Sequence, residues 1–168
     1  MADILDSLLG YLRGLNASNG VMRTAPGETY GPAVSRITRT PIRFTENLSA
    51  AQNNGEYDPA TKTIAINPKA QSDVPTMIRH ESIHALMDQV PGSGQMAAQS
   101  SGFPDIAKQM AGVGGDPSHE AVAYLGSYPT SQFRGLSDQI REGFLNDFGS
   151  KLSAADPVRG SAWSRLRK

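Results

Sequence analysis

The chain has 168 residues, with 16 Lys or Arg side chains balanced by 16 Asp or Glu and with no cysteine. This length suits one compact domain with a real core, and the balanced charge provides no overall field to attract nucleic acid or an anionic membrane. No stretch approaches the ~20 apolar residues that span a bilayer, so no membrane span is expected. Without cysteine, disulfides and thiolate metal sites are excluded, and any bound zinc must be held by histidine and carboxylate side chains.

The first predicted element is an amphipathic helix over residues 3–16, whose apolar side chains recur at helical spacing. Loop punctuation by Asn, Gly and Pro follows, so residues 1–32 are predicted to form a helix and loop apart from a domain over 33–152. The helix either packs on that domain or docks on a partner. Asp3 and Asp6 stand where a secretory signal would carry positive charge, so we expect no cleaved leader and a cytoplasmic or virion-associated protein.

Strand patterns follow in the next part of the chain. Residues 41–45 alternate polar and apolar side chains, and residues 55–58 and 61–67 flank an Asp-Pro turn, which predicts a β-hairpin. We expect the second hairpin strand to be the edge of a small sheet beside a cleft. That edge would pair with an extended peptide substrate through residues Thr63, Ala65 and Asn67.

The most informative motif is His80-Glu81-Ser82-Ile83-His84, an H-E-x-x-H pattern within a predicted helix. The helix is predicted to start near Asp73, with a proline in its first turn, and to end before Pro91. Residues four apart on a helix lie about 40° apart around its axis, so both imidazoles project from one face and can bind one metal ion. Glu81 lies about 100° from His80 and can reach a water molecule at that ion.

A catalytic zinc needs a third protein ligand, and Glu120 is the best candidate. It lies on a helix predicted over residues 118–125, where small alanine residues let two helices approach closely. His119 is an alternative ligand if this helix is rotated by one residue, and Asp116 or Asp105 would serve in an aspartate variant. Alternatively, Glu120 binds no metal and is a carboxylate that only stabilises the start of its helix.

The hairpin, the H-E-x-x-H helix and the following helix with its Glu-Ala-Val-Ala-Tyr sequence resemble the gluzincin branch of zinc metallopeptidases, a thermolysin-like core in reduced form. The resemblance spans residues 55–128 and implies a zinc ion (Zn²⁺) held by His80, His84 and Glu120. The metzincin branch is excluded, because Met and Val stand where its glycine and third histidine would be. The expected fold is α+β and minimally zincin-like: a small sheet with an edge strand beside the H-E-x-x-H helix, followed by a mainly helical C-terminal half.

The predicted chemistry is peptide-bond hydrolysis by a zinc-activated water, with Glu81 as the general base. The developing oxyanion needs a further donor, for which Tyr124, one turn after Glu120, is preferred and His119 comes second. Asp88 either orients a ligand histidine or is a surface charge. The substrate would be a protein or the peptide part of a bacterial cell wall. The alternative function is a structural or docking component of a larger assembly, such as a phage particle, that carries an active or inactive metallopeptidase-like domain.

Beyond the motif, residues 92–116 are rich in Gly, Ser, Gln and Ala and are predicted to be irregular, with one short helix over 104–110. A final helix is predicted over 131–152. Residues 153–168 are expected to be a basic tail that, with the N-terminal helix, would contact a larger assembly. Nucleic-acid contact by this tail, with Trp163 stacking on a base, is the least favoured interpretation.

Overall fold

The computed structural model describes residues 38–48, 54–69, 73–133 and 135–167. The helix predicted near the N-terminus, and the unit of helix and loop to which it was assigned, lie outside the described residues.

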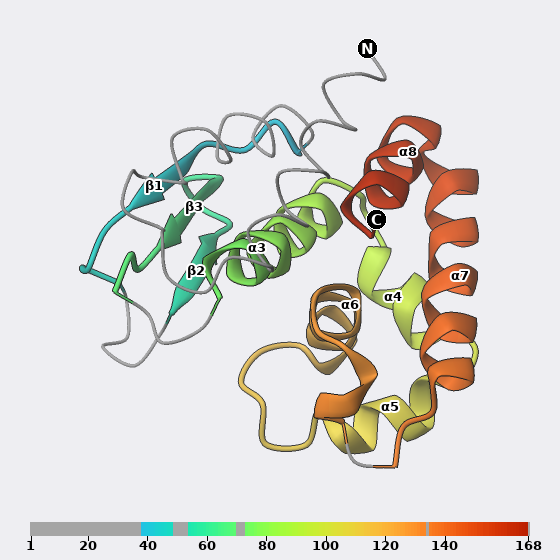
Figure 1. Cartoon of the computed structure of the whole chain (residues 1–168). Helices are drawn as coiled ribbons and strands as arrows, with labels where there is room; N and C mark the ends of the chain where they lie inside the picture. The colour runs from blue at the N-terminus through green and yellow to red at the C-terminus, as the bar shows by residue number, and fades with distance from the viewer. Residues whose placement is uncertain (1–37, 49–53, 70–72, 134, 168) are drawn as a thin grey trace.

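Helix α3, which carries the H-E-x-x-H motif, lies between a small sheet and a helical C-terminal half (Figure 1). In chain order the described elements are β1 (Ile42–Phe44), β2 (Gly55–Asp58), β3 (Thr63–Ile66), α3 (Val74–Asp88), α4 (Ser93–Ala98), α5 (Phe103–Gln109), α6 (Pro117–Ser127), the 3₁₀ turn η1 (Thr130–Gln132), α7 (Asp138–Ala155) and α8 (Pro157–Leu166). This arrangement confirms the predicted α+β fold class. None of the described helices is both long and apolar enough to cross a membrane.

The sheet has three described strands in the order β1-β3-β2, with β1 parallel and β2 antiparallel to β3. The predicted hairpin is therefore present, as β2 and β3. Asp58 closes its turn, because its carboxylate accepts hydrogen bonds from the backbone N–H of Ala60 at 2.8 Å and from the hydroxyl of Thr61 at 2.6 Å. An aspartate that binds its own turn in this way explains why the chain reverses here.

The prediction that Thr63, Ala65 and Asn67 form the free edge of the sheet is wrong. Strand β3 is central: the N–H of Ile64 donates to the carbonyl of Pro41 at 2.9 Å on one side, and β2 pairs with β3 on the other. Even the N–H of Asn67 donates to a backbone carbonyl, that of Asn54, at 2.9 Å. The physical reason is the continuous apolar run of β3, which is buried on both faces as central strands are. Among the described strands, β2 is the edge that lies beside α3.

Helix α3 begins where the sequence predicts. Asp73 is its N-cap, and its carboxylate accepts a hydrogen bond from the N–H of Thr76 at 3.0 Å, while Pro75 occupies the first turn. Most of its apolar residues are buried against the sheet and the other helices, and Ile78 and Ile83 are completely buried. The helix is thus a rigid element on which side chains can be positioned precisely.

A close contact between α3 and α6 brings the two candidate metal-binding helices together. A side chain at Gly126 of α6 would place its Cβ 2.7 Å from Cδ1 of Ile83 and 3.4 Å from the ring of Trp163, so only glycine leaves this space open. Asp116 caps the start of α6 by accepting a hydrogen bond from the N–H of Ser118 at 2.8 Å. The contact at Gly126 therefore sets how closely α6 approaches α3, and the Asp116 cap fixes where α6 begins.

The C-terminal half contains more helix than predicted. Helix α4 falls in a stretch that was expected to be irregular, whereas α5 matches its predicted short helix. The apolar periodicity predicts a final helix from residue 131, but α7 starts at Asp138. A 3₁₀ turn comes first, then Gly135 with a φ of +77°, and the hydroxyl of Ser137 caps the helix by accepting from the N–H of Ile140. These turn and cap signals override the apolar periodicity of residues 131–137.

The expectation of a free basic tail is also wrong for the described residues after α7. They form helix α8, whose Trp163 is only 2 % exposed and meets Phe148 edge to face at a ring separation of 5.1 Å. Helices α7 and α8 approach so closely that a Cβ at Gly160 would lie 2.6 Å from Cα of Ser153. Because Trp163 is part of the core, it is not available to stack on a nucleic-acid base.

Candidate metal centre

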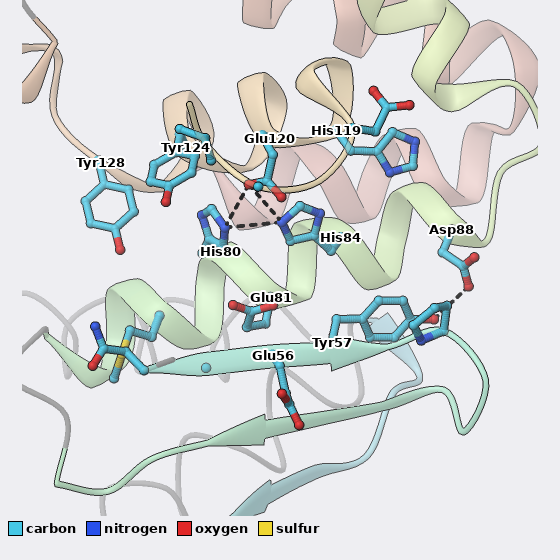
Figure 2. A pocket seen from close by; sticks show the side chains of 17 residues that line it. Glu56, Tyr57, His80, Glu81, His84, Asp88, His119, Glu120, Tyr124 and Tyr128 are labelled. Carbon is cyan, nitrogen blue, oxygen red and sulfur yellow. Dashed lines mark hydrogen bonds and ion pairs between the residues drawn. The ribbon is translucent and has the colours of Figure 1, made fainter. Parts of the chain in front are cut away.

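Two imidazoles of α3 and one carboxylate of α6 converge at a single point (Figure 2). The Nε2 atoms of His80 and His84 are 3.2 Å apart, and Oε2 of Glu120 lies 3.6 Å from each of them. Their side chains are 11, 15 and 15 % exposed, respectively. Within the described part of the chain, this is the one group of three metal-binding side chains whose ligand atoms come together.

The distances within this group fit a tetrahedral metal ion. Zinc binds histidine nitrogen and carboxylate oxygen at about 2.0–2.2 Å, which places neighbouring ligand atoms of a tetrahedral site about 3.3–3.6 Å apart. The three separations measured between His80, His84 and Glu120 are 3.2, 3.6 and 3.6 Å. The side chains are therefore arranged to hold a divalent metal ion without large movement, and their donor atoms suit zinc among other transition metals.

The charge state of the group also favours a cation. Burial alone would raise the pKa of Glu120, but hydrogen bonds to His80 and His84, together with their charges, lower it to about 2. Burial opposes charge on His84, yet its hydrogen bond to Glu120 and the negative charges of Glu81 and Glu120 raise its pKa above the usual histidine value. Glu120 thus stays a carboxylate across the ordinary pH range, and a bound cation would replace the proton that His84 attracts.

Glu81 lies between the metal-binding group and strand β2 (Figure 2). It is 8 % exposed, and it accepts a hydrogen bond from the backbone N–H of Tyr57. A Cβ at Gly55 would lie 3.2 Å from Cγ and 3.3 Å from Oε1 of Glu81, so glycine at this position of β2 gives the carboxylate its room. Burial raises the pKa of Glu81 even though the two neighbouring histidines work against the shift.

Two tyrosines lie on the other side of His80. The ring centres of Tyr124 and Tyr128 are 4.6 Å and 6.0 Å from that of His80 and 5.5 Å from each other. Burial and nearby negative charge raise the pKa of both hydroxyls. Both therefore remain protonated at neutral pH and can donate a hydrogen bond into the space beside the metal-binding group.

The group forms one wall of a cavity of about 730 Å³ between α3, α6 and β2. Glu81, Tyr124 and Tyr128 line this cavity as well. A space of this size accommodates several residues of an extended chain or a small molecule.

The alternative ligands considered from the sequence do not join the group. His119 lines the cavity, but its ring packs on α4, where a Cβ at Gly94 would lie 3.0 Å from its Nε2. Asp116 caps α6, and Asp105 forms an ion pair with Lys108 at 2.9 Å on α5. These three residues therefore have other partners.

Asp88 does not orient a ligand histidine. Its carboxylate accepts a hydrogen bond from the hydroxyl of Tyr57 at 2.7 Å and pairs with the ammonium group of Lys62 at 2.5 Å. These bonds tie the end of α3 to the β2–β3 hairpin. Of the two roles considered for Asp88, the structure shows a surface charge at the end of the helix. Asp88 also holds the hairpin to α3.

Sequence reasoning missed several residues that shape this site. Tyr57 and Gly55 act from the edge strand β2, and no local pattern marks them. Gly115 has a φ of +96°, and a Cβ there would lie 2.7 Å from Oε1 of Glu120. The Gly-Val-Gly-Gly run before α6 was a visible signal for special backbone geometry, but it did not reveal which glycine touches the carboxylate.

Comparison with protein-family models, with curated proteins and with solved structures finds no match to this chain.

Proposed function

We propose that the protein is a zinc-dependent endopeptidase. The observation that supports this most directly is the convergence of His80, His84 and Glu120, with the buried Glu81 beside them on the same helix. A metal ion held only for stability would need a fourth protein ligand and no cavity, whereas this three-ligand group borders open space, as catalytic zinc sites do.

The residues around the cavity would divide the chemistry between them. Zinc bound to this group would polarise a substrate carbonyl and lower the pKa of water towards ~7. Glu81, whose pKa is raised by burial, takes the proton from the attacking water and later delivers it to the leaving nitrogen. The hydroxyl of Tyr124 donates a hydrogen bond to the oxyanion that develops on the substrate.

An extended peptide fits the shape of the site. Strand β2, with Asn54 just before it, lines the cavity, and β2 is an edge strand of the described sheet. A substrate strand laid along β2 would bring an amide bond past the metal-binding group. The proposed substrate strand is thus β2 in place of β3, and the substrate is a protein or a cell-wall peptide.

The test combines metal analysis with one conservative substitution. We expect the purified protein to contain about one zinc per chain and to cleave unfolded protein or fluorogenic peptides. The Glu81→Gln variant should keep its zinc and lose activity by about 10²–10⁴-fold, because only the proton acceptor is removed. Glu142→Gln, on α7 outside the cavity, is the matched control and should cleave like the unsubstituted protein. Lack of bound zinc, or full activity of Glu81→Gln, would refute the proposal.

A further inference from the structure

A second cavity, of about 420 Å³, lies beside α8 and shares no described lining residue with the cavity at the metal centre. Three arginines line it: Arg39, which lies just before β1, and Arg159 and Arg165 of α8. Its lining contains no Asp or Glu side chain among the described residues. Three positive side chains from two distant parts of the chain therefore share one hollow.

These three arginines lack the carboxylate partners that most described cations have. Six other Lys and Arg side chains form ion pairs: Lys62, Lys69, Lys108, Arg141, Lys151 and Arg167. Within the described ranges, none of the three cavity arginines does so.

The acidic residue nearest to Arg159 in the sequence, Asp156, is used by the backbone of α8. Its carboxylate accepts hydrogen bonds from the N–H groups of Val158 and Arg159, both at 3.0 Å, and so caps the helix. Asp156 offsets at most one of the three positive charges, so the cluster keeps an excess of at least two.

The segment that carries Arg39 is held firmly in place. Arg39 has a φ of +55°, which is uncommon for a residue other than glycine and persists only where the surroundings enforce it. Its neighbours Thr38 and Thr40 are buried, and the side-chain amide of Gln89 donates to the carbonyl of Thr38 at 2.7 Å and to the hydroxyl of Thr40 at 3.3 Å. Arg39 itself is exposed. The backbone of Arg39 is thus positioned before any ligand binds, which reduces the entropy that binding must offset.

We infer that this cavity binds a small organic phosphate monoester. Guanidinium groups bind phosphate oxygens through paired, parallel hydrogen bonds. A phosphate monoester carries about 1.5–2 negative charges at pH 7 and three acceptor oxygens. This charge matches the excess of the cluster, whereas a single carboxylate carries only one charge.

The remaining wall of the cavity suits the organic part of such a ligand. Pro157, Val158 and Ala162 line it, and Val158 is 63 % exposed although it is apolar. The hydroxyl of Ser161, which also lines the cavity, accepts a hydrogen bond from the guanidinium group of Arg165 at 3.3 Å. The volume falls within the range of about 300–1,000 Å³ that is typical of sites for small organic ligands.

Calorimetric titration with three probes tests the inference, at pH 7.5 and constant ionic strength. Phenyl phosphate carries the dianion on an apolar body, inorganic phosphate lacks the body, and benzoate has the body with a single charge. We expect saturable binding of one phenyl phosphate per chain, weaker binding of inorganic phosphate, and binding of benzoate at least about tenfold weaker. Binding of inorganic phosphate or benzoate as tight as that of phenyl phosphate, or no saturable binding of phenyl phosphate, would overturn the inference.

Arginine variants locate the site. Arg159→Gln and Arg165→Gln should each weaken phenyl phosphate binding by about tenfold or more, because each removes charged hydrogen-bond donors. Arg43→Gln removes an exposed charge on β1, outside both cavities, and should bind like the unsubstituted protein. Phenyl phosphate held by a metal ion at His80 and His84 would bind all three variants equally, and that result overturns the inference.

Two features keep this test decisive. Arg159 is half-buried, so circular dichroism checks that its variant folds; if it does not, Arg165→Gln, which changes an exposed side chain, decides the outcome. None of these measurements uses peptide cleavage. The phosphate site therefore stands or falls independently of the proposed peptidase function.

Discussion

Replacing Gly115 by alanine should weaken metal binding without touching a metal ligand. Gly115 precedes the capping residue of α6, with a φ of +96°, and its Cβ would lie 2.7 Å from Oε1 and 3.5 Å from Cδ of Glu120. Real Cβ atoms essentially never approach another atom closer than 3.0 Å. The carboxylate of Glu120 must therefore move or rotate, and its Oε2 leaves the position 3.6 Å from both imidazoles.

The magnitude has two separable parts. An L-residue in the left-handed region costs about 1–2 kcal/mol, and this part lowers the stability of the whole protein. Disturbing the orientation of a metal ligand costs about 10–100-fold in metal affinity, which corresponds to about 1.4–2.7 kcal/mol. Only the second part depends on contact with Glu120.

Gly112 provides the control that separates the two parts. It also has a positive φ, +92°, but a Cβ there meets nothing within 4 Å. In a zinc competition titration against a chelating dye, Gly115→Ala should bind 10–100-fold more weakly, and Gly112→Ala should bind like the unsubstituted protein. Urea unfolding of the metal-free proteins should show similar losses of stability for both variants. Equal zinc affinity of the two folded variants would refute the geometry described for Glu120.

Three further predictions concern stability and pH. Gly160→Ala should lower the free energy of unfolding in urea by about 1–3 kcal/mol, because its Cβ would lie 2.6 Å from Cα of Ser153. The control Gly143→Ala, whose Cβ would meet nothing within 4 Å, should raise that free energy by about 0.5–1 kcal/mol. Equal effects of the two substitutions would contradict the close packing of α7 and α8. Burial opposes ionisation of Asp88, but hydrogen bonds from Lys62 and Tyr57 lower its pKa. The ionised Asp88 therefore stabilises the fold above its unfolded pKa, and this stabilisation is lost as the pH falls through the lower folded pKa. Asp88→Asn should accordingly show a shallower loss of unfolding free energy in acid than the unsubstituted protein. Because the pKa of His84 is raised in the metal-free protein, protons compete with zinc already above the usual histidine range. The zinc affinity measured by competition should therefore fall steadily as the pH is lowered from 8 to 6. A zinc affinity that does not change with pH would argue against histidine ligation.

The local features of the chain could be predicted because their causes are local. The alignment of His80 and His84 follows from helical periodicity, and the limits of α3 follow from an aspartate cap, a proline in the first turn and a proline after the end. The β2–β3 hairpin follows from the turn chemistry of Asp58. Each of these depends on residues within a few positions of one another.

The errors have non-local causes. The central position of β3 depends on pairing with β1, about 20 residues earlier in the chain, and alternation within a strand does not show how many neighbours it has. The burial of Trp163 depends on glycines of α6 and α7 that leave space for its ring. A basic composition near the C-terminus therefore suggested a tail, although the apolar face of α8 packs on the core.

The sequence by itself determined the two histidines and the neighbouring acid, because a helix carries side chains four residues apart to the same face whatever surrounds it. Only the tertiary structure decided that Glu120 meets them, since that depends on the packing of α6 against α3 at Gly126 and on the space left at Gly115. The cavity beside the metal-binding group is likewise a tertiary property, because its lining comes from β2, α3 and α6. Helix periodicity acts over one or two turns, whereas a metal site beside a shaped cavity exists only where distant segments pack together.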